Sequence, residues 1–212
     1  MAKCPLITEI EKVQGLSSTC FWLHECASDV DDEAMVEIHL SHQQFHYFED
    51  TSTFISKLDI KQFFCGEELN VSMIQTFMRL LYNELIASSE PMFGWLCPSI
   101  VRDDSCLRNK RELKEYLNTS LKACSRLGYK IILLPHIETN HWTLIAICLS
   151  CNEAYHFDSL RKQPPRSLLV KSLLNSVMKD VNAIGLRAHK ISFGIQSSVR
   201  NKKVDLRVGI MS

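Results

Sequence analysis

The sequence predicts an α+β domain in which helices pack on a central, mostly antiparallel sheet. Two long segments, 69–85 and 107–127, repeat apolar residues every three or four positions, as amphipathic helices do. Three strand-like segments then follow one another between residues 129 and 157. Helices followed by a run of neighbouring strands are typical of the α+β layout. With 212 residues, of which 46% are hydrophobic, the chain is long enough for one packed core.

The charge balance excludes a general electrostatic attraction to nucleic acid or to acidic membranes. Lys and Arg together number 24, and Asp and Glu also number 24, so the net charge is zero. The residues from Arg187 onward are locally basic, and we interpret them as a solvated tail. No stretch reaches the ~18–20 apolar residues of a membrane span, and the first residues lack the apolar core of a secretory signal. We therefore expect no nucleic-acid partner and no membrane partner.

The nine cysteines are scattered and odd in number, which favours reduced thiols and a location in the nucleus or cytoplasm. Cys148-Leu-Ser-Cys151 has the spacing of a redox motif or of half a zinc site. No second Cys or His pair of suitable spacing accompanies it. We interpret these two cysteines as small buried or turn residues.

Residues 1–54 are expected to form an N-terminal extension, in which the alternating segment Met35–Leu40 predicts a short strand. His39, His42 and His46 recur at spacings of three and four, so on a helix they would share one face and could bind a metal. No carboxylate or thiol occupies a matching position in the sequence. Polar surface histidines are therefore the favoured interpretation.

The residues from 51 to 128 predict one extended segment and three helices. Apolar residues at helical spacing predict each helix, and residues that favour helix ends bound it. The expected elements are an extended segment at 51–58, a short helix that Asp59 caps and Gly66 ends, a helix at 69–85 capped by Asn70 or Ser72, a packed loop or short strand at 91–98, and a helix at 107–127 that Gly128 closes.

The residues from 129 to 199 predict the sheet and the last helix. Runs of β-branched and aliphatic residues predict the strands, and polar or proline-containing segments separate them. The expected elements are a buried strand at 129–135, a strand at 141–149, a turn at 150–152, a strand at 153–157, an amphipathic helix at 167–178 after Pro164 and Pro165, and a strand at 190–199.

An imidazole and a carboxylate are expected at the same end of the central hairpin. His141 begins one strand, and Asp158 follows the end of its antiparallel neighbour. Such a carboxylate holds a histidine in one tautomer and stabilises the imidazolium, as in two-thirds of a nucleophilic triad. Trp142 beside the histidine is either a wall of the site or a core anchor. A triad in this order needs a thiol after Asp158, but all nine cysteines lie at or before Cys151.

Several segments resemble those of the ubiquitin-like-protein-specific protease (Ulp) family, the cysteine proteases that process and remove SUMO and related modifiers. The resemblance covers roughly residues 55–210. The sequence after the aspartate, Ser159-Leu160-Arg161-Lys162, is similar to the plant, transposon-associated branch. The segments that carry the resemblance are Leu58-Asp59-Ile60, the run from Glu67 to Gln75, Ile131-Leu133-Pro135, Asn140-His141-Trp142-Thr143-Leu144 and Tyr155-His156-Phe157-Asp158-Ser159-Leu160.

The resemblance implies a papain-like protease domain at 55–212 that uses no cofactor and no metal. His141 would be the general base, Asp158 its orienting carboxylate and Trp142 an aromatic wall that binds substrate. The implied partner is a ubiquitin-like modifier or its protein conjugate, and the family implies a nuclear location.

The resemblance also identifies departures near the C-terminus. Asp205 falls on the family's acidic position, but Leu206 occupies the nucleophile position, Arg200 the oxyanion glutamine and Arg207 the glycine. Leucine has no lone pair with which to attack a carbonyl. The chain ends at Ser212, where the family's next helix would begin, so that C-terminal helix is expected to be missing and the domain incomplete.

Three functions remain open at this point. The first is a cysteine peptidase of the Ulp family, impaired at Leu206, for which Cys65 is a substitute nucleophile only in a papain-like order. The second is a non-catalytic module that binds a ubiquitin-like protein beside Trp142. The third is a transposon-derived relic.

Overall fold

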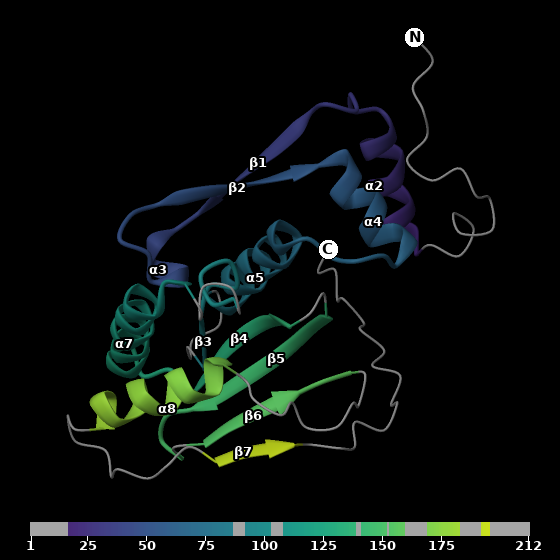
Figure 1. Ribbon diagram of the computed structural model, residues 1–212. Helices are drawn as coiled ribbons and strands as arrows, with labels where there is room; N and C mark the ends of the chain where they lie inside the picture. The colour runs from purple at the N-terminus through teal and green to yellow at the C-terminus, as the bar shows by residue number, and fades with distance from the viewer. Residues whose placement is uncertain are drawn as a thin grey trace.

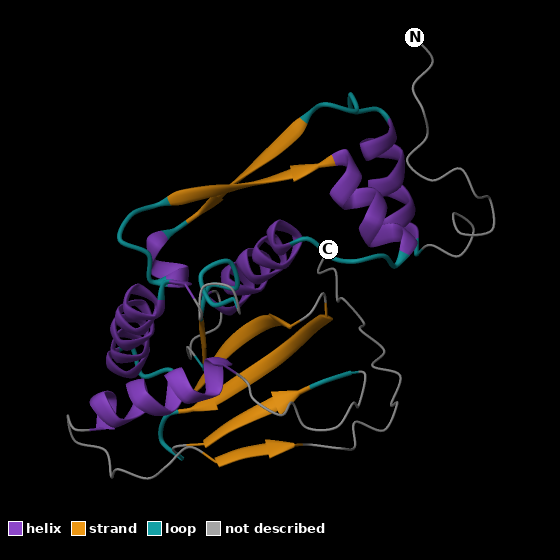
Figure 2. Ribbon diagram, in the orientation of Figure 1, coloured by secondary structure: helices purple, strands orange, loops and turns teal. Residues whose placement is uncertain are grey.

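A computed structural model of the chain describes residues 17–86, 92–102, 108–138, 141–151, 153–159, 169–182 and 192–195. These residues form an α+β fold, as predicted, with a five-stranded sheet and a separate two-stranded ribbon (Figures 1 and 2). Helix α5 (Val71–Ile86) lies between the ribbon and the sheet. None of the described helices is both long and apolar enough to cross a membrane.

The central sheet is mixed. Its strand order is β3-β4-β5-β6-β7, with antiparallel pairing in the middle (β4 with β5, β5 with β6) and parallel pairing at the edges (β3 with β4, β6 with β7). The expected antiparallel arrangement therefore holds for the three central strands. The strands are β3 (Phe93–Trp95), β4 (Ile131–Glu138), β5 (His141–Cys148), β6 (Glu153–Phe157) and β7 (Ser192–Ile195).

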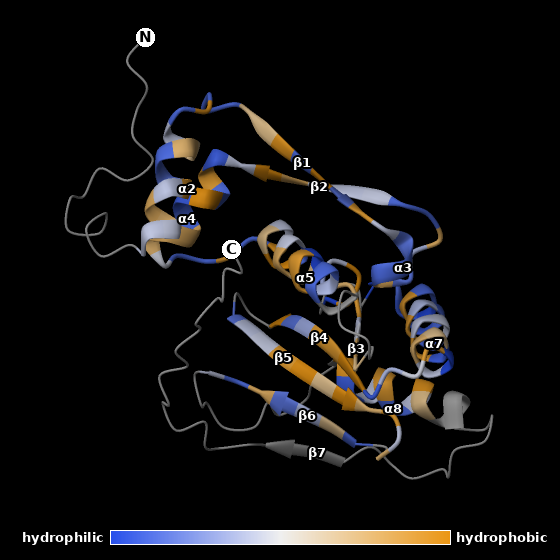
Figure 3. Ribbon diagram, turned by 180° about the vertical axis from the view of Figure 1, so that it is seen from behind, coloured by the Kyte–Doolittle hydropathy of each residue, from blue (hydrophilic) through white to orange (hydrophobic). Residues whose placement is uncertain are grey.

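The two faces of the sheet have different surroundings. On one face, Ile145 and Ile147 of β5 are fully buried in a hydrophobic core shared with α7 (Lys110–Arg126) and α8 (Leu169–Asn182). The alternate residues of β5, such as Leu144, are only half-buried and point to the opposite face, because successive strand side chains alternate. Figure 3 shows hydrophobic colouring along β4, β5 and α5, the elements that frame this second face.

Strand β4 continues past Pro135, the residue at which the sequence predicts its end. The prediction ended this strand at Pro135, but Pro135 pairs with Leu144 and β4 extends to Glu138. Strand β3 pairs only with residues 131–133. Beyond them β4 is an edge strand on that side, so the missing N–H of proline removes no ladder hydrogen bond there.

Helix α4 (Lys57–Cys65) begins earlier than predicted, and the expectation that Asp59 is its N-cap is wrong. The hydroxyl of Ser56 accepts a hydrogen bond from the Asp59 N–H at 3.2 Å, and the Asp59 carboxylate accepts one from the Ser56 N–H at 2.8 Å. This reciprocal arrangement is a capping box with Ser56 as the N-cap. At α5 the two alternatives resolve in favour of Asn70, whose side-chain oxygen accepts from the Ser72 N–H at 3.2 Å.

The N-terminal part contains more regular structure than the sequence predicts. Helix α2 (Ser18–Ser28) has little amphipathic periodicity in its sequence, and only His24 and Ala27 of it are buried. Strand β1 (Met35–Leu40), which was predicted, pairs antiparallel with β2 (Thr51–Ser56) along its whole length. The expected boundary between residues 54 and 55 lies inside β2, and the division into two parts stays a prediction.

Buried leucines on α7 should contribute far more stability than exposed leucines on α5. Leu121 is fully buried, whereas Leu80 is 58% exposed. We predict that Leu121→Ala lowers the free energy of unfolding by about 2–5 kcal/mol, because it leaves a cavity in the core. The matched substitution Leu80→Ala should cost less than about 1 kcal/mol. Urea denaturation of both variants measures the difference, and equal losses would contradict the core described above.

Candidate active site

The β5–β6 hairpin brings His141 and Asp158 together, as the sequence predicts. Leu144 pairs with Phe157, so the start of β5 and the end of β6 meet at the same edge of the sheet. There the Nε2 atom of His141 lies 2.8 Å from Oδ1 of Asp158. The side chains are 26% and 19% exposed, respectively, so the pair is sheltered but open to a substrate.

This contact determines which ring nitrogen of His141 remains available. When Nε2 carries the proton and its N–H donates a hydrogen bond to the Asp158 carboxylate, Nδ1 keeps its lone pair. Nδ1 forms no hydrogen bond with any described residue. The geometry can therefore orient an imidazole that accepts a proton at Nδ1.

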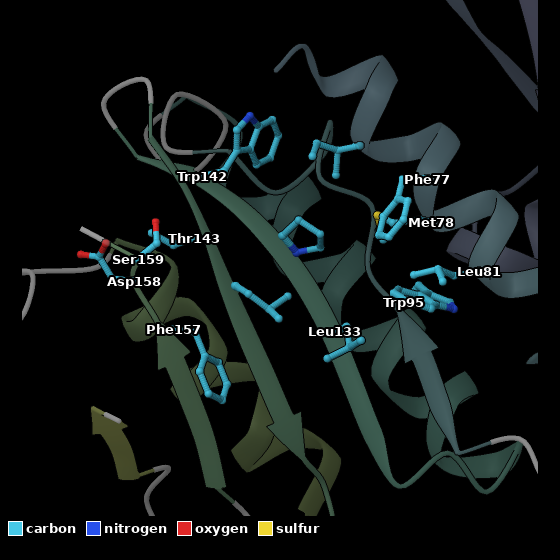
Figure 4. A pocket seen from close by; sticks show the side chains of 13 residues that line it. Phe77, Met78, Leu81, Trp95, Leu133, Trp142, Thr143, Phe157, Asp158 and Ser159 are labelled. Atoms are coloured by element: carbon cyan, nitrogen blue, oxygen red, sulfur yellow. The ribbon is translucent and has the colours of Figure 1, made fainter. Parts of the chain in front are cut away.

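An apolar groove with a volume of about 640 Å³ lies beside the pair, between α5 and the open face of the sheet (Figure 4). Asp158 and Ser159 lie on one side of it, and Leu81 and Trp95 lie on the other. Its wall is mostly apolar side chains from α5 and from strands β3 to β6. The lining residues are Ile74, Phe77, Met78, Leu81, Trp95, Leu133, Pro135, Trp142, Thr143, Leu144, Phe157, Asp158 and Ser159.

Of the two interpretations that the sequence left open for Trp142, the structure supports the wall, because the residue is half-buried and lies outside the hydrophobic core. Its indole lines the groove, and its Nε1–H donates a hydrogen bond to the Leu69 carbonyl at 2.7 Å. This bond ties the start of β5 to the segment just before α5. Trp142 is thus a wall of the groove, and its hydrogen bond connects the two sides of the groove.

His156 is a neighbour of the pair to which the sequence assigned no role. It lies opposite Ile145 in the β5–β6 ladder, on the core face of the sheet, and is 4% exposed. Burial lowers the pKa of His156, and the nearby imidazoles of His136 and His141 act in the same direction, against the opposing effect of Asp158. Alternation along β6 was the available signal, because Ala154 and His156 share one face.

Other residues that the sequence singled out are not brought to this site. Cys65 ends α4 and is half-buried, and no described cysteine forms a hydrogen bond with His141. Arg200 and Leu206 lie outside the described residues, as do the neighbouring positions 205 and 207 and the C-terminus where the missing helix was expected.

The three N-terminal histidines do not share a helical face. Ring nitrogens of His39 and His42 lie 3.5 Å and 2.6 Å from the carboxylate oxygens of Asp50. The sequence spacing did not predict a carboxylate beside these histidines. The Nε2 atom of His46 instead lies 3.0 Å from the Cys124 sulfur and is mostly buried, so the surface interpretation is wrong for His46. Within the described part of the chain, no three or more His, Cys, Asp or Glu side chains are arranged to hold a metal ion.

A family model decides the relationship that this geometry suggests. Residues 67–188 match the model described as the Ulp1 protease family, C-terminal catalytic domain. The chain belongs to the Ulp1 protease family. The match includes α5, the central hairpin, His141 and Asp158, so the Ulp1-type domain contains the whole of the groove.

Solved structures share this Ulp1 fold. SUMO protease Ulp1 with its catalytic cysteine oxidized to a sulfinic acid superposes with a TM-score of 0.55 at 16% identity, covering 86% of this chain and 75% of that one. The C-terminal Ulp1 protease domain in complex with Smt3, the yeast orthologue of SUMO, gives 0.52 at 14% identity, covering 85% and 74%. A de-sumoylating protease gives 0.52 at 20% identity, covering 68% of this chain and 60% of that one. A comparison with curated proteins finds no match.

Removing the Asp158 carboxylate should weaken the preference of His141 for the Nε2–H tautomer. We predict that Asp158→Ala lowers the population of the Nε2–H form of His141, because its acceptor is lost. Side-chain ¹⁵N shifts, recorded at a pH where histidine rings are neutral, measure this population. Ser159→Ala, at the neighbouring groove residue, serves as the control and should leave the shifts of His141 unchanged. The same shift pattern in Asp158→Ala and the wild type would contradict the assigned contact.

The buried His156 should make stability depend on pH. Its folded pKa lies below the ordinary value of 6.5, so the unfolded chain binds a proton at a higher pH than the folded chain does. The free energy of unfolding should therefore fall as the pH drops below about 6.5. His156→Phe should make this fall shallower, and the lowered pKa of the mostly buried His46 should leave a remainder. Urea unfolding across this range measures both, and an equally steep fall in the variant would refute the assignment.

Proposed function

We propose that this Ulp1-family domain recognises SUMO or a related ubiquitin-like modifier, as a precursor or a conjugate, and that its hydrolytic step is impaired. The observation that carries the proposal is the His141–Asp158 contact of 2.8 Å at the end of a groove that Trp142 lines. His141 and Asp158 hold the positions of the family's general base and its orienting carboxylate, and Trp142 binds the modifier's C-terminal tail.

The choice of partner follows from the family and from the proteins that share its fold. One structural neighbour is described as a de-sumoylating protease, and another was solved in complex with Smt3, the yeast orthologue of SUMO. A modifier tail is an extended peptide that must reach the catalytic pair. The half-buried indole of Trp142, beside His141, offers such a peptide an apolar contact surface with little side-chain entropy to lose.

The impairment follows from the nucleophile position. The resemblance aligns Leu206 with the catalytic cysteine and Arg200 with the oxyanion glutamine. Without a thiol, the proton acceptor at His141 has no nucleophile to activate, and only the modest rate effects of binding and orientation remain. A non-catalytic module that binds the modifier is therefore the form of the function that we favour over an active peptidase.

An active peptidase using another thiol is the second candidate, but the described residues disfavour it. No described cysteine forms a hydrogen bond with His141, and Cys124 is fully buried beside His46 instead.

Binding and turnover measurements test the proposal together. Titration calorimetry with SUMO should show binding, and a SUMO C-terminal fluorogenic amide should show no turnover above a buffer blank. Trp142→Ala should weaken binding by about tenfold or more, as expected for a central aromatic contact. Trp22→Ala, at a tryptophan on α2 that is 66% exposed, is the matched control and should leave the affinity unchanged.

Each alternative has its own outcome. Turnover that His141→Ala abolishes would overturn the impairment and establish an active peptidase. If the protein shows no binding and no turnover, the proposal is overturned in favour of a relic. A gain of His141-dependent turnover in the triple variant Arg200→Gln, Leu206→Cys, Arg207→Gly would support the assigned nucleophile position.

A further inference from the structure

Two cysteines lie together at the end of the central hairpin that is remote from His141. Cys148 is the last residue of β5 and pairs with Glu153, the first residue of β6. Cys151 lies in the turn between these strands. Cys148 is half-buried and Cys151 is exposed. Of the two interpretations from the sequence, buried residues or turn residues, the structure therefore supports the turn. Both are free thiols that small reagents in solvent can reach.

The turn directs several polar groups at the sulfur of Cys148. The backbone N–H of Cys151 donates to it at 3.3 Å. The hydroxyl of Ser150 lies 3.4 Å from the Cys148 sulfur and 3.9 Å from the Cys151 sulfur, so it bridges the two. A backbone donor and a hydroxyl that converge on one sulfur stabilise a thiolate there.

The two thiols are consequently unequal. Burial opposes ionisation of Cys148, and the charge of Glu153 does so too, but hydrogen bonds from the Cys151 thiol, Ser150 and the Cys151 N–H outweigh them and lower its pKa. The hydrogen bond to Cys148 raises the pKa of Cys151. This asymmetry distinguishes an attacking thiol from a resolving thiol in a Cys-x-x-Cys motif.

We propose that Cys148 and Cys151 form a redox-active dithiol that exchanges with small disulfides such as oxidised glutathione. The Cys148 thiolate attacks one sulfur of the disulfide, forming a mixed disulfide and releasing one glutathione thiolate, which takes up a proton. The Cys151 thiol then loses its proton and attacks the Cys148 sulfur, which releases the second glutathione. The protein dithiol loses two electrons and two protons, and one oxidised glutathione becomes two reduced molecules.

The buried thiols of the described residues lack this arrangement. Cys124 is fully buried, and burial raises its pKa to about 12, so it stays protonated. Cys97 is also fully buried, among the hydroxyls of Tyr47 and Ser99. The exposed Cys26 on α2 provides a comparison thiol on another element.

Mass spectrometry after treatment with oxidised glutathione tests the dithiol. Trypsin releases residues 131–161 as one peptide, in which Cys148 and Cys151 are the only cysteines. After alkylation of free thiols, this peptide from the treated wild type should carry neither alkyl groups nor glutathione and should lack two hydrogen atoms. Cys151→Ser should instead stop at the mixed disulfide, with one glutathione retained on Cys148. In Cys148→Ser, glutathione should add to Cys151 about threefold more slowly, or slower still.

Two controls make the outcome decisive. Cys26→Ser should leave the oxidation of the 131–161 peptide unchanged, and Ser150→Ala should slow it by removing the bridging hydroxyl. A wild-type peptide that keeps both alkyl groups, or that accumulates glutathione on both cysteines, would overturn the proposal. The readout requires no modifier and no turnover, so it is independent of the function proposed for the groove.

Discussion

The antiparallel pairing of β5 with β6 is the constraint on which the candidate site depends. With Leu144 opposite Phe157, alternate side chains of both strands are divided between the core and the groove, and His141 meets Asp158 where the strands end. A shift of one residue would exchange the two faces and place Ile145 and Ile147 in the groove. Burial of those two isoleucines against α7 and α8 therefore determines the register, and the register positions the imidazole and the carboxylate.

The second side of the groove is held by different forces. Helix α5 buries Met78 but exposes Phe77, so part of its apolar surface faces the groove and solvent. The hydrogen bond from Trp142 to the Leu69 carbonyl connects the segment before this helix to β5. The width of the groove beside His141 thus depends on one buried helix face and one directional contact. This combination gives an apolar groove with a polar pair at one end, the general form of a ligand-binding site.

The same hairpin carries two kinds of chemistry at its two ends. Strand β5 begins at His141, where a histidine and a carboxylate meet, and it ends at Cys148, where a turn brings two thiols and a hydroxyl together. Both arrangements arise because a hairpin brings together residues that flank its strand ends. The turn needs only local sequence to bring Cys148 and Cys151 together, whereas the pair at the other end needs the full register of the ladder.

Periodicity by itself determined the α+β class, the helices at α5 and α7 and the central strands, because these depend on local patterns of burial. The pairing of His141 with Asp158 was predicted from two successive strands and from family motifs, and the register of the folded ladder then positions it. Only the tertiary structure decided that β4 passes through Pro135, that Ser56 caps α4, that Asp50 contacts His39 and His42, that His46 contacts Cys124, and that His156 faces the core behind the His141–Asp158 pair. Most of these features depend on which segments become neighbours, and a side chain's partner across space leaves no trace in its own sequence spacing. The capping box is the local exception: Ser56 and Asp59 are only three residues apart, but the hydrogen bonds that make Ser56 the N-cap form only in the folded backbone.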